Sequence, residues 1–218
     1  MADPTEIDTL SSPAQSARRT QAERRAQSDQ SLLDAAAELI AEEGFQAATF
    51  EKVGARAGYS RGLASQRFGS KDGLIEALIN ELHQRSDELY ADEGVDALSG
   101  LDAILGSVDT FLRNFETETA LRAYFVAMAG TVATLSRLRA AFAASHQKAK
   151  TRFMSQIDRG QADGSISLEI DAEAAALMIG SLLLGVSTQW LIDPTTDLAR
   201  IRETAVATLR RSLGMARR

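Results

Sequence analysis

The chain has 218 residues, no cysteine, two histidines, three prolines and a formal net charge of −6. This length suffices for a sizeable hydrophobic core, in one mid-sized domain or in a small domain fused to a larger one. The lack of cysteine excludes disulfides and thiolate metal sites, and nothing indicates an oxidising compartment. Helix-favouring residues are plentiful and few segments alternate with period two, so we predict an all-α fold.

The sequence also bears on location. The N-terminus has no apolar signal core, and the longest apolar stretch, residues 174–186, is too short to span a bilayer. We therefore expect a soluble, cytoplasmic protein with no membrane partner.

Residues 1–22 are mostly small or polar and contain two of the three prolines, which predicts a disordered N-terminal arm. Arg18, Arg19, Arg24 and Arg25 precede the first predicted helix, where an arm can reach an adjacent minor groove. A solubilising tail explains the same cluster equally well. Residues 18–71 carry nine Lys or Arg against seven Asp or Glu, so a weakly basic region precedes an acidic remainder.

The first helix is predicted to begin at Ser28 or Asp29 and to end at Glu43, before Gly44. Two short helices follow within residues 49–68. Thr49 caps the first of them, and Gly58 supplies the positive φ that a tight turn requires.

Ser60 caps the third helix, whose outward residues are basic, small or amide-bearing. Such side chains suit a helix in the DNA major groove, where Arg reads guanine and Gln reads adenine. An ordinary helical hairpin with a solvated polar face is the alternative. Further amphipathic segments follow, for about nine helices in all, at about residues 71–91, 96–115, 118–131, 135–162, 171–191 and 197–213.

The helix predicted over 171–191 is apolar nearly all round, so it must be covered on several sides. With the amphipathic last helix it can form half of a four-helix interface in a two-fold dimer. A core helix within one subunit explains the same pattern.

The stretch EEGFQAATFEKVGARAGYSRGLASQRFGSKDGLIEAL resembles the signature of the tetracycline-repressor (TetR) family. The resemblance is specific over about residues 28–80. It implies a helix-turn-helix DNA-binding domain over residues 23–72 and a helical effector-binding and dimerisation domain over 73–218. One departure is that Ser65, Gln66 and Arg67 stand where many members carry an aromatic residue and a histidine.

The resemblance implies a homodimeric regulator, more often a repressor than an activator, that binds double-stranded DNA at a palindromic operator. Thr49 and Lys71 are expected at phosphates, Gly62 at a close backbone approach and Arg67 at phosphate or base, with base edges read by Arg61, Ser65 and Gln66. The expected DNA-binding residues are Thr49, Ser60, Arg61, Gly62, Ser65, Gln66, Arg67 and Lys71. The expected dimer interface comprises Ala175, Met178, Ile179, Leu182, Val186, Ile201, Ala205 and Leu209.

The resemblance further implies a small-molecule effector, bound in a helical pocket, that shifts the helix starting near Lys71. Large apolar and aromatic residues can line this pocket, although ordinary core packing is the alternative. They are Phe111, Phe115, Tyr124, Phe125, Met128, Phe153, Met154 and Trp190.

An enzyme is the main competing interpretation. His83 and His146 lie apart in the sequence without a Glu three residues before either, and no nucleotide-binding or nucleophile-elbow motif occurs. We therefore expect no catalytic residues, no metal site and no cofactor. A helical dimer that binds small molecules but not DNA is the other alternative.

Overall fold

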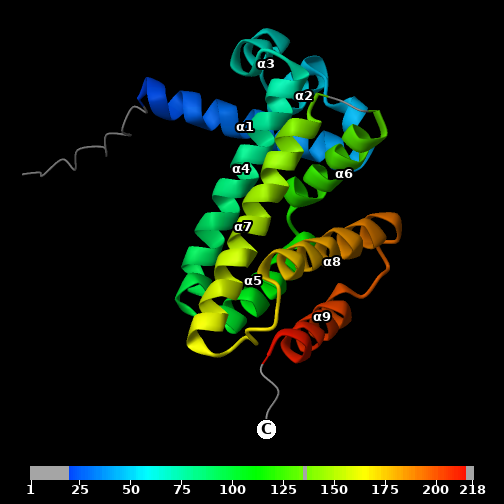
Figure 1. The fold of residues 1–218 in the computed structure, drawn as a ribbon. Coiled ribbons are helices and arrows are strands. Elements are labelled where there is room, and N and C mark those ends of the chain that lie inside the picture. Colours follow the sequence, from blue (N-terminus) through cyan, green and yellow to red (C-terminus); the bar gives the residue numbers. More distant parts are fainter. Residues whose placement is uncertain (1–19, 135–136, 215–218) are drawn as a thin grey trace, which may run out of the picture.

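The structure is a computed structural model that describes residues 20–134 and 137–214. Within these ranges the chain forms nine α-helices and two short 3-10 helices (Figure 1), which confirms the predicted all-α fold. The α-helices are α1 (Gln21–Glu43), α2 (Phe50–Ala57), α3 (Arg61–Phe68), α4 (Lys71–Asp92), α5 (Gly100–Phe115), α6 (Thr119–Thr134), α7 (Arg139–Asp163), α8 (Ala172–Ile192) and α9 (Leu198–Leu213), and the 3-10 helices are η1 (Phe45–Ala47) and η2 (Val95–Ala97).

Helices α1, α2 and α3 form a small head at one end of the molecule (Figure 1). Leu32 and Ile40 of α1, Val53 of α2 and Ala64 of α3 are fully buried between them. Helix α4 leaves this head and runs beside α7 along the body. The head is thus a three-helix unit, and the long helix α4 follows its last helix directly.

The core of the head continues into the body without a break. The hydrophobic cluster that contains Leu32 and Val53 also contains Leu74 of α4, Ala123 of α6 and Phe115 of α5. Helix α1 packs along α6 as well as against α2. Packed side chains therefore connect α4 and α6 to the head.

A second hydrophobic cluster joins α5, α7, α8 and α9 at the far end of the body. Helices α5 and α7 cross closely at this end. A Cβ added to Gly100 would lie 2.0 Å from the backbone nitrogen of Gly160. The two backbones can approach this closely because Gly100 carries no side chain, and the Gly100 N–H also donates to Asp163 Oδ2 at 2.9 Å.

Helix α1 begins earlier than predicted. Thr20 caps it: its Oγ1 accepts from the Glu23 N–H at 3.2 Å, and Glu23 Oε2 accepts from the Thr20 N–H at 2.7 Å. The predicted start at Ser28 or Asp29 is therefore wrong, because this capping box lies two turns upstream. Arg24 and Arg25 belong to the helix rather than to an arm, while Arg18 and Arg19 lie outside the described residues.

Helix α8 is 21 residues long, and it is long and apolar enough to cross a membrane by length and composition alone. The predicted apolar stretch over 174–186 is thus part of a longer helix. A single such helix is weak evidence for a membrane span, because helices in cores and subunit interfaces have the same composition.

Candidate nucleic-acid interface

The turn between α2 and α3 fixes how the third helix is presented. Gly58 has a φ of +76°, in the left-handed region that favours glycine. The Tyr59 N–H donates to the Gly54 carbonyl at 2.8 Å. A Cβ on Gly54 would lie 2.9 Å from the Tyr59 carbonyl oxygen, so the two helices approach more closely than any side chain at Gly54 allows.

Helix α3 has one buried face and one outward face. Ala64 is fully buried, and Leu63 and Phe68 pack half-buried against the core of the head. The opposite face consists of three exposed residues and one half-buried serine, namely Arg61, Gly62, Gln66 and Ser65. This face carries the hydrogen-bonding groups that can reach base edges in a major groove.

Three hydroxyl side chains cap the helices at this end of the molecule. Thr49 Oγ1 accepts from the Lys52 N–H at 3.3 Å, Ser60 Oγ from the Leu63 N–H at 3.1 Å, and Ser70 Oγ from the Gly73 N–H at 3.0 Å. Thr49 and Ser60, both predicted DNA contacts, are exposed. Their hydroxyls therefore stabilise the helix starts in the free protein.

Two cations of α2 are paired within the head. Lys52 Nζ lies 2.6 Å from Glu43 Oε2, and Arg56 lies 2.7 Å from Glu42 Oε2. The hydrogen bond from Lys52 lowers the pKa of Glu43, and the hydrogen bond to Glu42 raises the pKa of Arg56. Arg61 differs, because it is exposed and forms no ion pair with any described residue.

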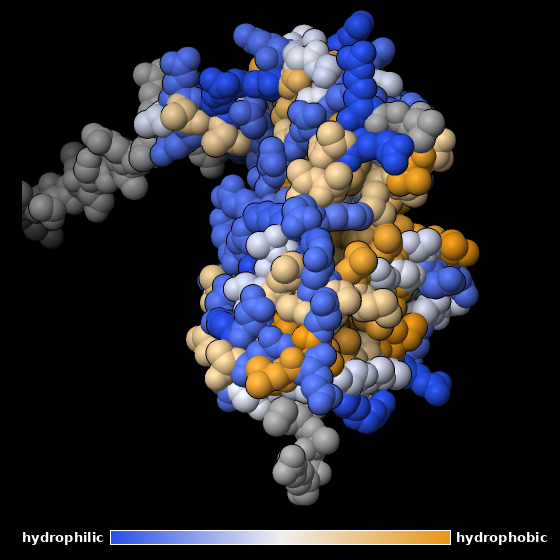
Figure 2. Space-filling view, viewed as in Figure 1, coloured by the Kyte–Doolittle hydropathy of each residue, from blue (hydrophilic) through white to orange (hydrophobic). Residues whose placement is uncertain are grey.

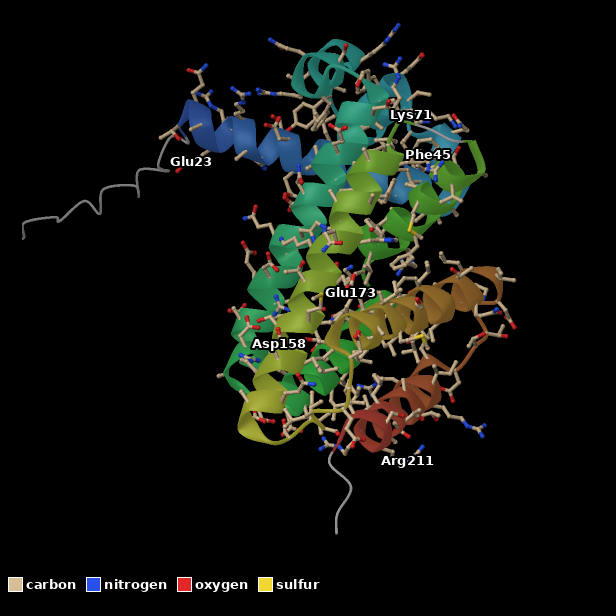
Figure 3. All side chains as sticks on the ribbon, viewed as in Figure 1. Glu23, Phe45, Lys71, Asp158, Glu173 and Arg211 are labelled. Carbon is tan, nitrogen blue, oxygen red and sulfur yellow. The ribbon has the colours of Figure 1, made fainter. Side chains whose placement is uncertain are left out.

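Two further predicted contacts also have partners in the structure. Arg67 Nε lies 2.9 Å from Asp29 Oδ1, and only 19% of the Arg67 side chain is exposed. Lys71 lies over the Phe45 ring at 4.3 Å from its centroid (Figure 3), and its Nζ donates to Gln46 Oε1 at 3.3 Å. Burial lowers the pKa of Lys71. Both side chains thus brace the head in the free protein.

The predicted pocket residues fall into two groups. Five form one aromatic cluster, in which the Phe115 ring centroid lies 5.5 Å from that of Phe125 and 5.6 Å from that of Trp190. The ring centroids of Phe111 and Tyr124 lie 6.0 and 5.2 Å from that of Phe125. Met128 is buried in the same hydrophobic cluster. Phe153 and Met154 instead pack in the second cluster, with α5 and α8.

The predicted dimer surface is a hydrophobic face on α8 and α9. Met178 and Leu177 are 69% and 61% exposed, whereas Ile179 and Ala205 are buried within the subunit. A groove of about 470 Å³ runs between the two helices, lined by Leu182, Val186, Asp197, Arg200, Ile201, Thr204, Ala205 and Thr208. Figure 2 shows hydrophobic residues gathered on this side of the molecule.

Comparison with known proteins identifies the family. Residues 32–78 match the model of bacterial regulatory proteins of the tetR family. Residues 101–214, more than half of the chain, match the C-terminal model of BetI-type transcriptional repressors. The chain belongs to the TetR family of transcriptional regulators. No curated protein matches it.

Solved structures of TetR-family regulators share its fold. A putative TetR-family transcriptional regulator from Rhodococcus sp. superposes with a TM-score of 0.74 at 23% identity, over 87% of this chain and 100% of that one. The SmeT–triclosan complex gives 0.72 at 23% identity, over 86% and 92%. FadR from Bacillus subtilis in complex with stearoyl-CoA gives 0.69 at 18% identity, over 83% and 96%.

The TetR-family body also contains a polar cluster that sequence reasoning missed. Ser145 Oγ of α7 lies 2.8 Å from His83 Nε2 of α4 and 2.9 Å from the Tyr124 hydroxyl of α6. The ring of His146 lies 6.4 Å from that of Tyr124. Burial lowers the pKa of both histidines, which favours their neutral forms. No sequence motif signals this cluster, since its members come from three helices.

Proposed function

We propose that this TetR-family regulator is a cytoplasmic homodimeric repressor that binds a palindromic operator and is released from it by a small molecule. The observation that carries the DNA-binding part is the outward face of α3. Arg61, Gly62 and Gln66 are exposed there, on a short helix held by the Gly58 turn. Arg bidentate to guanine and Gln bidentate to adenine are the pairings that this face offers.

The α8–α9 face supports the dimer. Exposure of the large Met178 side chain and of the apolar groove to water is unfavourable. Pairing with the same face of a second copy removes these groups from water. Two-fold pairing places two copies of α3 on one side of a duplex. Recognition helices in such dimers lie about 34–36 Å apart, one turn of DNA, which requires a pseudo-palindromic site.

The aromatic cluster between α5, α6 and α8 supports an apolar effector. It joins directly to the core that contains α4 and the head. Two structurally similar regulators are described in complex with apolar or amphipathic molecules, triclosan and stearoyl-CoA. A 100-fold loss of DNA affinity requires a preference of only about 2.7 kcal/mol between two states.

A selection of genomic DNA fragments bound by the protein tests this function. We expect recovery of a short pseudo-palindrome, with neighbouring genes that suggest the effector to add in a release assay. A protein that binds all fragments equally, or none, would contradict sequence-specific regulation. A protein whose head separation is unchanged by a releasing effector would contradict release by movement of α4.

A further inference from the structure

Helix α1 projects beyond the rest of the head. Every residue from Gln21 to Ala26 is exposed, and Ser28 is the first buried residue of the helix. Six helical residues span about 9 Å. Figure 1 shows this overhang extending away from the body, and Figure 3 places Glu23 near its tip.

The overhang is stabilised locally rather than by burial. Exposed helical turns gain little from tertiary packing, which supplies most helix stability in proteins. The reciprocal hydrogen bonds between Thr20 and Glu23 offset this, since such a cap contributes about 0.5–2 kcal/mol. Glu23 is thereby turned back onto the Thr20 N–H, and Arg24 and Arg25 remain as the exposed charges.

A shared carboxylate connects the overhang to the recognition helix. Arg25 Nε lies 3.8 Å from Asp29 Oδ2, and Asp29 Oδ1 lies 2.9 Å from Arg67 Nε of α3. The Arg25 side chain is 67% exposed, whereas the Arg67 side chain is 19% exposed. Arg25 therefore shares a carboxylate with Arg67 of α3 while its side chain stays mostly in solvent, and one aspartate offsets only one of these two arginines.

Other cations of the head have partners within it. Lys52 and Arg56 are paired with glutamates at the end of α1, and Lys71 is held over Phe45. Arg24 forms no ion pair with any residue in the described ranges. Among the described residues of the head, Arg24 and Arg61 are thus exposed cations without an ion pair, and Arg25 has the most exposed side chain of the ion-paired cations.

We propose that Arg24 and Arg25 bind the sugar-phosphate backbone of DNA flanking the bases that α3 reads. This inference rests on the proposed function, because the DNA must already lie against α3. Duplex DNA carries one negative charge per about 1.7 Å of axis, so a basic surface next to the recognition helix meets phosphates on either side of a half-site. Such contacts fix the register of the protein on the duplex and add affinity without reading sequence. Arg67, which is paired with Asp29, positions α3 against α1 instead.

The double variant Arg24→Gln/Arg25→Gln tests the inference, because it removes both charges and leaves Thr20 and Glu23 intact. Affinity for a long mixed-sequence duplex and for the selected operator is measured over a range of salt concentrations. We expect the slope of log affinity against log salt to fall by about two per subunit, at about 0.9 per lost phosphate contact. The loss should be the same factor on both DNAs.

The matched control is Arg210→Gln/Arg211→Gln, which removes two adjacent charges from α9. Figure 3 shows Arg211 at the end of the molecule opposite the head. An unchanged slope in this control together with a reduced slope in the α1 variant supports the inference. Equal effects in the two variants would attribute the loss to net charge and overturn it.

A second measurement separates this inference from the proposed function. Shortening the duplex to the palindrome alone should reduce the difference between the α1 variant and the parent, because the phosphates outside the palindrome are removed. If the α1 variant matches the parent on every DNA while Gln66→Ala weakens operator binding, the inference fails and the regulator remains. If the parent itself binds no DNA, both fail.

Discussion

Gly62 lies on the exposed face of α3, where the fold itself does not require glycine. A Cβ at this position would meet only Ser60 Oγ, at 3.7 Å, so nothing inside the protein requires glycine there. Glycine within an exposed helix costs about 1 kcal/mol relative to alanine. We propose that a close approach of DNA to α3 is the reason for glycine at this position.

We therefore expect Gly62→Ala to raise the free energy of unfolding by up to about 1 kcal/mol and to weaken DNA binding. Urea unfolding and operator affinity measure the two effects. Gly54→Ala is the control and should destabilise the fold, because its Cβ would lie 2.9 Å from the Tyr59 carbonyl. Unchanged affinity in Gly62→Ala would remove this glycine from the interface.

The histidines make stability depend on pH. Burial lowers the pKa of His83 below its ordinary value of 6.5, and Lys148 lowers it further while Asp87 opposes the shift. The unfolded chain therefore binds the proton more readily than the folded one. The contribution of neutral His83 to the free energy of unfolding is fully present above pH 6.5, and it is lost as the pH falls through the pKa of His83 in the folded protein.

We expect the free energy of unfolding to fall below pH 6.5, with each histidine contributing a slope no steeper than about 1.4 kcal/mol per pH unit. His83→Gln should flatten this dependence, because glutamine can still bond Ser145 but does not titrate. Urea unfolding between pH 5 and pH 7.5 measures it. An equally steep dependence in the variant would assign the loss of stability to other groups.

At the scale of helices, the α5–α7 crossing depends on Gly100. Gly100→Ala would place a Cβ 2.0 Å from the Gly160 backbone nitrogen, so the helices must separate. Forced overpacking of this kind typically costs about 1–3 kcal/mol. Thermal unfolding should show this loss, with Gly106→Ala in the same helix as the control, because a Cβ there meets side chains at 3.5 Å or more. Equal stability of the two variants would contradict a required close crossing.

Most helices were predictable from the sequence, and the exceptions have physical reasons. Most helix boundaries follow from local signals in the sequence. Examples are the N-caps Ser60 and Asp171 and the terminating glycines Gly44 and Gly58. The start of α1 was missed because its exposed first turns carry no apolar periodicity. Only the Thr20–Glu23 capping box marks it.

The candidate sites were predictable only in part. The outward face of α3 follows from helical periodicity, so its exposed residues were foreseen. The partners of Arg67 and Lys71 were not, because Asp29 and Phe45 reach them through the tertiary fold. The separation of Phe153 and Met154 from the aromatic cluster likewise depends on how α7 packs, which periodicity does not determine.

The whole molecule is expected to act as a two-fold dimer. Met178→Glu places a charge in the exposed apolar face of α8, so we expect dissociation into folded monomers and loss of high affinity for the palindrome. Sedimentation and operator binding measure both. Val132→Glu alters a similarly exposed apolar residue on α6 and should leave the dimer intact. A dimer unaffected by Met178→Glu would place the interface elsewhere.

Base recognition by the outward face of α3 is tested most directly by the affinity of the parent and of Gln66→Ala for every single base-pair variant of the selected operator. We predict that Gln66→Ala costs about 1–3 kcal/mol and relaxes the preference at one base pair in each half-site only. A uniform loss across all variants, or no loss at all, would contradict base recognition by this helix.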